Sequence, residues 1–482
     1  MRRSYLFITL TTIFLALGIV MSMGSWAKSN SSGNYAVLAL LAAVCLLPII
    51  INNLRHSLDV FEPIYAFVLS TFIYFVFVPL VQFTQDSFRF LGKDYSADAG
   101  WVTLLALLSL TGFYLGYYWR TNIPVWNKIV FAKGALKYPR MRALLWQLSF
   151  IIFGVFAMMT VLWIVIARVP LNTLWVIGQA TYGDAWLLSS GPTIGYFYNA
   201  RDSLIALILM LFVYRAKKRW PIIELGLLVA LTLFFVGGGV RYRLLLLVLA
   251  VLFFYFLQRG ERPRSWQYVL VAFLVFYFVI GGVGFFRGQT MQAGQLHGLA
   301  IGEDPYSVQD AWKILIDNSQ ISVSTAVLVH TIPEYHPYFY GRSFLNLFTQ
   351  PIPRFLWPEK PTNFGQDFFD NLWPKGTTVP FWALFFLNFG PVAIVPGMIL
   401  WGYISRRIYD AYSANPKDEL HRIQLAVYWS FIIQMYGRGG DNFAFNVYGW
   451  VFLLAPVWIV LLLREKLSGY YQRRFESSDT SS

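Results

Sequence analysis

The chain of 482 residues is 57% hydrophobic and 13% charged, and its formal net charge is +14. Water-soluble domains carry roughly 45–50% apolar and roughly 25% charged residues, so this composition excludes a water-soluble globular fold. The one cysteine, Cys45, lies within an apolar run, which excludes a disulfide framework and a thiolate metal site. The sequence also lacks Walker-type loops, HExxH and Asp-x-Asp triplets, which argues against an ATPase, a zinc protease and a metal-bound sugar-nucleotide site.

Apolar runs long enough to cross a bilayer, roughly 20 residues each, follow one another along the chain. They begin near Tyr5, Tyr35, Phe61, Ala97, Leu144, Tyr196, Pro221, Leu244, Trp266, Pro380, Ile423 and Asn446. We therefore predict an all-α polytopic membrane protein with about 12 transmembrane helices.

The first run has a second interpretation. Arg2 and Arg3, the apolar stretch and Ser25-Trp26-Ala27 also fit a signal peptide with a small-residue cleavage site. The run is long for a signal peptide, so we expect a retained first span. Cleavage would leave the later topology unchanged.

Basic residues gather in alternate loops between the runs, as they do on the cytoplasmic side of membrane proteins. When Arg2 and Arg3 are placed inside, the inside loops and the tail hold most of the 38 lysines and arginines. We therefore expect a multi-pass membrane protein with both termini in the cytoplasm. This placement accounts for the positive charge without a nucleic-acid partner.

The same order of spans predicts the domain organisation. Transmembrane helices one to nine occupy residues 1–286, a large external loop or cap occupies 287–379, helices ten to twelve occupy 380–464, and a cytoplasmic tail occupies 465–482. Prolines between Pro333 and Pro361, among many aromatic residues, indicate fixed turns in the external loop. We expect this loop to determine specificity.

Arginines on the outer side depart from the positive-inside pattern. Arg201 falls inside the sixth span, where a guanidinium costs several kcal/mol unless it is paired or functional. Asp202 is the nearest carboxylate in sequence, but adjacent residues on a helix point apart, which weakens that pairing.

Gly-Arg turns recur at the outer ends of the spans. They are Gly237–Arg243, Gly284–Gly288 and Tyr436–Asp441, and they carry Arg241, Arg243, Arg287 and Arg438. Glycines permit close backbone approach, helix N-termini bind anions, and arginine donates two parallel hydrogen bonds to phosphate. Alternatively, the arginines reach lipid headgroups and the glycines mark helix ends.

Candidate bases lie in the external loop. His330, Glu334 and His336 have the side chains that can remove a proton from a sugar hydroxyl. A structural or solvated role is the alternative for each histidine. Pro333 and Pro337 interrupt any regular ligand spacing, so we expect no metal here.

A resemblance to a known family begins in the same loop. The stretch Gln350-Pro351-Ile352-Pro353-Arg354-Phe355-Leu356-Trp357-Pro358-Glu359-Lys360-Pro361 resembles the Pro-Arg…Trp-Pro-x-Lys-Pro signature of bacterial O-antigen polymerases (Wzy-type oligosaccharide repeat-unit polymerases). Leu387–Gly390, expected in the first half of span ten, resembles the block that follows in that family, and the Gly-x-Arg turn before span eight looks like a third element. Many members carry an acidic residue shortly before the second block, where this chain has Ala383 and Leu384.

The resemblance implies a membrane glycosyltransferase that acts without a cofactor. It would lie in the bacterial cytoplasmic (inner) membrane, with the external loop in the periplasm. A growing glycan on undecaprenyl diphosphate would pass to the terminal sugar hydroxyl of the next lipid-linked repeat unit, building O-antigen or exopolysaccharide at the outer membrane face. The diphosphate would be bound by cations, and the proton would go to His330, Glu334 or His336. The candidate cations are Arg201, Arg241, Arg243, Arg287, Arg354, Lys360 and Arg438.

Two other functions fit the same architecture. An O-antigen ligase would move the glycan to lipid A-core, and a flippase would transport the lipid-linked unit without chemistry. No matching repeat halves, which are common in transporters, are found in the sequence, and the Trp-Pro-Glu-Lys-Pro block favours a polymerase. Besides membrane lipid and the lipid-linked oligosaccharide, a chain-length regulator and a flippase are the candidate partners.

Overall fold

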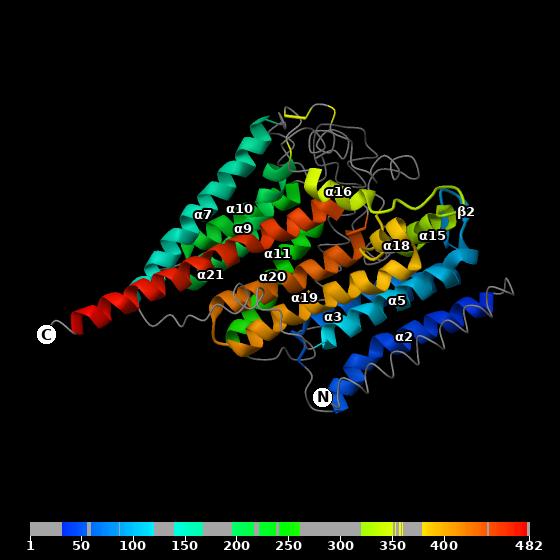
Figure 1. Cartoon of the computed structure of the whole chain (residues 1–482), viewed down its shortest axis with the longest axis horizontal. Coiled ribbons are helices and arrows are strands. Elements are labelled where there is room, and N and C mark those ends of the chain that lie inside the picture. The colour runs from blue at the N-terminus through cyan, green and yellow to red at the C-terminus, as the bar shows by residue number, and fades with distance from the viewer. Residues whose placement is uncertain are drawn as a thin grey trace, which may run out of the picture.

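The computed structural model describes the chain in segments that contain nearly all the predicted spans. These are residues 31–54, 59–85, 87–119, 139–166, 195–215, 221–237, 241–260, 320–349, 378–440 and 443–479, together with residues 352, 356, 357 and 359. In these segments the regular structure is helical apart from one two-stranded hairpin. Most of the long helices run side by side along one direction (Figure 1).

The helices follow the predicted apolar runs closely. Their bounds are α2 Ser31–Leu54, α3 Pro63–Phe72, α4 Val78–Thr84, α5 Ala99–Tyr118, α7 Pro139–Ile166, α9 Gly195–Tyr214, α10 Ile222–Gly237, α11 Arg241–Arg259, α15 Ile321–Thr331, α16 Arg342–Thr349, α18 Ala383–Phe389, α19 Ile394–Ala414, α20 Glu419–Arg438 and α21 Phe443–Asp479. A π-helical turn, η1 Ile73–Phe77, joins α3 to α4, and the hairpin pairs β1 Arg89–Phe90 with β2 Lys93–Asp94. The 3-10 helices are η2 Ser96–Asp98 and η5 Pro391–Ala393.

Four stretches of the described chain are long and apolar enough to cross a membrane: Pro63–Thr84, Ser96–Tyr118, Arg142–Leu162 and Asn446–Arg464. They correspond to the predicted spans three, four, five and twelve. Helices α2, α9, α10, α11, α19 and α20 lie on six further predicted runs. The predicted spans one and nine lie outside the described residues, so the total of twelve stays a prediction.

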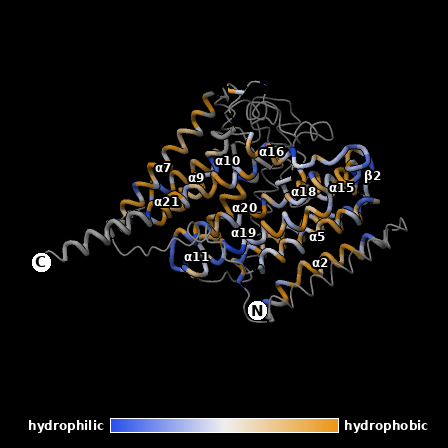
Figure 2. Tube along the Cα trace, in the orientation of Figure 1, coloured by the Kyte–Doolittle hydropathy of each residue, from blue (hydrophilic) through white to orange (hydrophobic). Residues whose placement is uncertain are grey.

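Hydropathy is distributed as expected for helices in lipid. Apolar residues follow the long helices along their length (Figure 2). On α7, the side chains of Ile151, Met158 and Val165 are 63%, 57% and 65% exposed although they are apolar. An apolar face that the protein itself leaves uncovered is what a lipid-facing helix presents.

Small residues bring α5 and α19 into backbone contact. A Cβ atom on Gly116 would lie 1.9 Å from the carbonyl oxygen of Ile399, and one on Gly402 would lie 2.1 Å from that of Phe113. Gly112 and Gly116 form a Gly-x-x-x-Gly pattern, which allows membrane helices to approach closely. Beside this contact the ring of Phe113 stacks on Phe67 of α3 with centroids 3.9 Å apart.

The chain breaks where we expected a continuous tenth span from Pro380. Helix α18 ends at Phe389, Gly390 adopts φ +78°, and α19 begins only at Ile394. A positive φ suits glycine, and Pro391 directly after it removes a backbone donor. The Leu387–Gly390 block therefore closes a short helix before the span, which corrects its expected place inside the span.

The part of the 287–379 loop that the structure describes is built into one end of the bundle. The side chains of Ile321–Leu328 in α15 are buried, and α15 packs on α4, α5 and the β1 strand. Next to them, Phe339 and Tyr340 donate backbone hydrogen bonds to Leu387 (3.0 Å) and Asn388 (2.9 Å). The loop thus shares packing with the helices around the candidate site.

Candidate functional site

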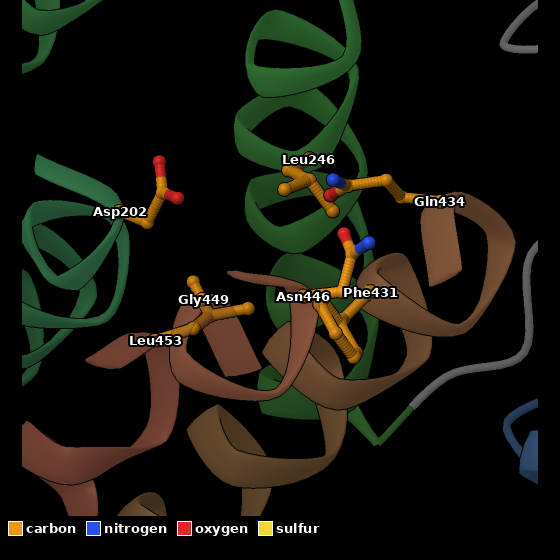
Figure 3. A pocket seen from close by; sticks show the side chains of 7 residues that line it. All are labelled: Asp202, Leu246, Phe431, Gln434, Asn446, Gly449 and Leu453. Atoms are coloured by element: carbon orange, nitrogen blue, oxygen red, sulfur yellow. The ribbon is translucent and has the colours of Figure 1, made fainter. Parts of the chain in front are cut away.

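A partly open cavity lies among α9, α11, α20 and α21 (Figure 3). The cavity is small, with a volume of about 10 Å³ that is enough for about one water molecule, and its polar lining comes from Asp202, Gln434 and Asn446. Helix α11 begins at Arg241, α20 ends at Arg438 and α21 begins soon afterwards. The cavity therefore lies near the end of the bundle where two of the predicted Gly-Arg turns are found.

An ion pair between two helices borders this cavity. Arg243 of α11 donates from Nε to Oδ1 of Asp202 at 2.5 Å and from Nη2 to Oδ2 at 3.3 Å. The Arg243 side chain is fully buried and that of Asp202 is 8% exposed. Charge-assisted bonds of this kind are among the stronger hydrogen bonds in proteins. Arg243, predicted as a diphosphate ligand, is therefore engaged with Asp202.

Of the six other predicted cations, three lie in described helices and three lie outside the described residues. Arg201 is 4% exposed within α9, as expected for a residue inside a span. Arg241 and Arg438 are the first residue of α11 and the last of α20, so their backbones lie at the cavity end of the bundle. Arg287, Arg354 and Lys360 lie outside the described residues.

The glycines at the end of α20 serve close packing. A Cβ atom on Gly440 would lie 2.2 Å from the carbonyl oxygen of Pro380, and one on Gly439 would lie 2.8 Å from Cβ of Phe381. Backbone hydrogen bonds connect the same segments, from Phe381 to Tyr436 (3.0 Å) and from Gly440 to Val379 (3.2 Å). For these two glycines the structure supports the alternative in which they mark a tightly packed helix end.

A second polar cluster surrounds the first predicted base. Nδ1 of His330 lies 3.2 Å from Oδ2 of Asp98, and Nε2 lies 3.3 Å from Nζ of Lys93. An ammonium group can only donate, so Nε2 accepts and the ring proton on Nδ1 is donated to Asp98. The side chains of His330 and Asp98 are 32% and 26% exposed, which leaves the cluster open to a ligand.

The residues of this cluster come from three separate segments of the chain. Lys93 follows the tight turn of the hairpin, where Leu91 and Gly92 both have positive φ. Asp98 is the last residue of η2, and His330 lies in the last turn of α15. Aromatic rings border the imidazole. The ring of Tyr95 meets it edge-on at 5.6 Å, and that of Tyr335 lies 5.8 Å away.

The two other predicted bases have different surroundings. Glu334 is exposed, and Nδ1 of His336 donates to the carbonyl oxygen of Pro337 at 2.7 Å. The ring of His330, by comparison, is oriented by the carboxylate of Asp98. In the part of the chain that the structure describes, no group of three or more His, Cys, Asp or Glu side chains could hold a metal ion.

Asn388, in the Leu387–Gly390 block, is a fully buried hydrogen-bonding centre. Its Oδ1 accepts from the backbone of Gly341 (3.1 Å), and its Nδ2 donates to the carbonyl of Leu384 (2.8 Å) and to Oγ of Ser343 (2.5 Å). The side chain fixes the loop that precedes α16 against α18. Its role here is to position the loop.

Several of these residues were missed by the sequence interpretation. Asp202 was considered only as a partner of Arg201, and the polar residues Gln434 and Asn446 within apolar runs were not singled out, although polar side chains inside spans are a known signal of function. Lys93 is 237 positions from His330, so sequence spacing held no signal for that contact.

Comparison with known proteins extends these observations. The model of the family described as O-antigen polysaccharide polymerase Wzy matches residues 5–466. Comparisons with curated proteins and with solved structures gave no match. The family match includes both polar clusters, all the described helices before α21, and α21 as far as residue 466, and it confirms the family resemblance seen in the sequence. The chain belongs to the O-antigen polysaccharide polymerase Wzy family.

Proposed function

We propose that this protein joins undecaprenyl-diphosphate-linked oligosaccharide repeat units into O-antigen polymer at the outer face of the bacterial inner membrane. The main support for this proposal is the family match over residues 5–466. The gathering of cationic helix ends and a histidine–aspartate pair at one end of the bundle supports it. The donor lipid and the outer-face location are parts of the proposal.

The donor diphosphate would be bound at the cationic end of the bundle. Arg241 and Arg438 begin and end helices beside the cavity, and Arg201 is buried nearby in α9. Cations held in place before the reaction stabilise the charge that develops on a diphosphate leaving group. Arg287, Arg354 and Lys360 remain candidates for the same role, and we assign Arg243 to positioning because it is bonded to Asp202.

His330 is our candidate base for the acceptor. The acceptor hydroxyl would displace Lys93 and give its proton to Nε2, its oxygen would bond to the donor anomeric carbon, and the bond from that carbon to the diphosphate would break. Asp98 would hold the ring and stabilise the imidazolium. Glu334 and His336 are weaker candidates because Glu334 is exposed and Nδ1 of His336 is engaged with the carbonyl oxygen of Pro337.

The positions of base and cations are compatible with one reaction. Ile321, at the start of α15, is adjacent to the end of α20, since a Cβ atom on Gly437 would lie 3.0 Å from its Cδ1. His330 follows nine residues later, roughly 13 Å along the helix. An extended arginine, a diphosphate and a sugar ring together can bridge such a separation.

Deletion of the gene, followed by gel analysis of surface glycan, tests this proposal against its alternatives. A polymerase mutant keeps single-repeat glycan and loses the ladder of longer chains. Complete loss of attached glycan would indicate a ligase instead. Accumulation of repeat units on the cytoplasmic side would indicate a flippase.

A further inference from the structure

We propose that the exposed side of α16 is a membrane-contact surface, which lies among the lipids of the leaflet at this end of the bundle. The α16 surface consists of Leu345 and Phe348 of α16, Phe389 of α18 and Val392 of η5. Its partner is membrane lipid, so the inference is separate from the polymerase activity. The contact anchors the loop that carries His330 to the bilayer.

Helix α16 has its polar and apolar sides reversed relative to a helix in water. Ser343 and Asn346 are buried, whereas Leu345 and Phe348 are 52% and 72% exposed. On the buried side, Oγ of Ser343 accepts a hydrogen bond from Nδ2 of Asn388 at 2.5 Å. A helix between protein and water buries its apolar side instead. The orientation of α16 therefore fits apolar surroundings outside the protein.

The exposed apolar side chains form one patch that extends from α16 to η5. The rings of Phe344 and Phe389 stack with their centroids 6.2 Å apart, and Phe389 is 53% exposed. Val392 follows three residues later and is 83% exposed. Single apolar side chains are common on protein surfaces, but contiguous apolar patches mark sites of contact with a membrane or another protein.

The position of α16 identifies lipid as the partner. The hydroxyl of Tyr448 donates a hydrogen bond to the carbonyl oxygen of Leu347. Tyr448 is the third residue of Asn446–Arg464, one of the stretches that are long and apolar enough to cross a membrane. Helix α16 also packs on α21 and lies beside the start of that helix (Figure 1). It is therefore at the level where a span leaves the bilayer, and tyrosine is enriched at this boundary.

The same surface continues along the tenth predicted span. Val392, Pro396 and Leu400 are exposed at intervals of four residues, so they lie on one side of the chain from η5 into α19. Lipid is the apolar medium around a span. Because the α16 surface joins this side through Phe389 and Val392, one continuous lipid contact explains both.

The residues around α16 suit the plane of the membrane surface. Amphipathic helices in this plane place apolar side chains among the acyl chains, with basic and aromatic residues near the headgroups. Arg342 begins α16 and Tyr340 precedes it, and both side chains are exposed. Asn388 of α18 ties this helix to the bundle, since its Oδ1 accepts from the backbone of Gly341 at 3.1 Å. The contact thus fixes the height of the loop above the bilayer.

Spin labels test this inference in liposomes made from phospholipid alone. Cys45, the one cysteine of the chain, is buried, and Cys45→Ala provides the background for single labels at Phe348→Cys and Leu345→Cys. Both positions are exposed, so a label does not disturb the core. Dissolved oxygen concentrates in lipid, whereas a charged nickel chelate stays in water. We expect both labels to be several-fold more accessible to oxygen than to the chelate.

Two matched positions calibrate this ratio. Ile151→Cys, on the exposed apolar side of α7, is the lipid reference, and Ser87→Cys, an exposed position three residues after the span Pro63–Thr84, is the water reference. A ratio at Phe348→Cys and Leu345→Cys that equals the ratio at Ser87→Cys would overturn the membrane contact. Labels that neither reagent reaches would overturn it as well, because another part of the chain or a second copy would then cover the surface.

A photoreactive side chain gives a second readout that identifies the partner. When Phe348 is replaced by p-benzoylphenylalanine, irradiation in the same liposomes should produce an adduct with the added mass of one phospholipid. A cross-link within the chain or between two copies would identify a protein partner instead and contradict the inference. These liposomes contain no lipid-linked substrate, so the result is independent of the proposed polymerase function.

Discussion

The Nδ1 atom of His330 lies 3.2 Å from Oδ2 of Asp98, so two residues from distant parts of the chain form a carboxylate–imidazole pair at the end of the bundle. The carboxylate selects the tautomer in which Nε2 carries the lone pair. This is the arrangement that a general base requires.

If the His330–Asp98 pair is the general base, its removal should slow polymerisation. His330→Ala should lower kcat by roughly 10²- to 10⁴-fold, the usual contribution of a general base. Asp98→Asn should cost about 10- to 100-fold, which corresponds to the loss of one charge-assisted hydrogen bond. Single-turnover polymerisation with lipid-linked repeat units measures both. If the pair is only structural, Asp98→Asn will lower the melting temperature and leave the rate per folded molecule unchanged.

The close packing of α5 on α19 predicts that larger side chains at the contact will destabilise the fold. Gly116→Ala places a Cβ atom where the carbonyl oxygen of Ile399 is only 1.9 Å away, so the two helices must separate. We expect a loss of about 2 kcal/mol or more, by analogy with overpacked cores, and a lower yield of monodisperse protein in detergent. Gly154→Ala is the control, since its Cβ meets nothing and alanine favours a helix. Equal melting temperatures for these two variants would contradict the close helix contact.

The opposite end of α20 is held by a buried network at Asp418. This carboxylate accepts from Nη1 and Nη2 of Arg464 (2.8 and 2.6 Å) and from Nδ1 of His421 (2.8 Å). Burial raises its pKa, but the hydrogen bonds from Arg464 and His421 outweigh this effect and hold the pKa of Asp418 well below its usual range. Asp418 also caps α20 by accepting from the backbone of Leu420 at 3.1 Å.

Removal of this carboxylate should therefore destabilise the fold. We expect Asp418→Ala to cost about 3–5 kcal/mol, because a buried arginine loses its partner. Asp410→Ala is the comparison. Asp410 pairs with Arg406 across one helical turn with both side chains about 30% exposed, and such pairs contribute roughly 0.3–0.5 kcal/mol. A loss for Asp418→Ala as small as that for Asp410→Ala would contradict the network.

The raised pKa of Glu62 predicts that the stability of the fold depends on pH. Burial raises the pKa of Glu62 to about 7, Arg406 opposes the rise and Asp59 adds to it. The folded state thus holds the proton more tightly than the unfolded state, so stability falls as the pH rises from about 4.5 to about 7. The hydroxyl of Tyr117 donates a hydrogen bond to Oε2 of Glu62 at 3.3 Å.

A neutral isostere should remove this pH dependence. Glu62→Gln should melt at the same temperature as the wild type near pH 5 and should be more stable at pH 8, by about 1–2 kcal/mol after allowance for partial exposure to solvent. Thermal unfolding in detergent at both pH values measures the difference. Parallel pH profiles for the two proteins would show that Glu62 ionises normally.

The sequence predicted the spans better than the site, and the reason is physical. Helices such as α5 and α7 are determined by local apolar length, which a single run of residues contains. The break at Gly390 was missed because the apolar residues on both sides of it suggested one continuous span, although the Gly390-Pro391 dipeptide is a sequence signal for a turn.

Contacts between helices could not be predicted in the same way. The arginine at 243 was identified as important, but its partner Asp202 belongs to another helix, and no spacing within one helix indicates that pairing. The same holds for His330, whose partners Asp98 and Lys93 come from a short helix and a hairpin, respectively, far away in sequence. The sequence thus predicts which residue types matter, and the packing of helices decides which of them meet.

The most direct test of the central assignment is reconstitution. The purified protein in proteoliposomes should convert undecaprenyl-diphosphate-linked repeat units into a ladder of products that differ by one repeat, without ATP or nucleotide sugars. Undecaprenyl diphosphate should be released once for each linkage formed. Repeat units that stay monomeric with an active, folded preparation, or that cross the bilayer without being joined, would contradict the account.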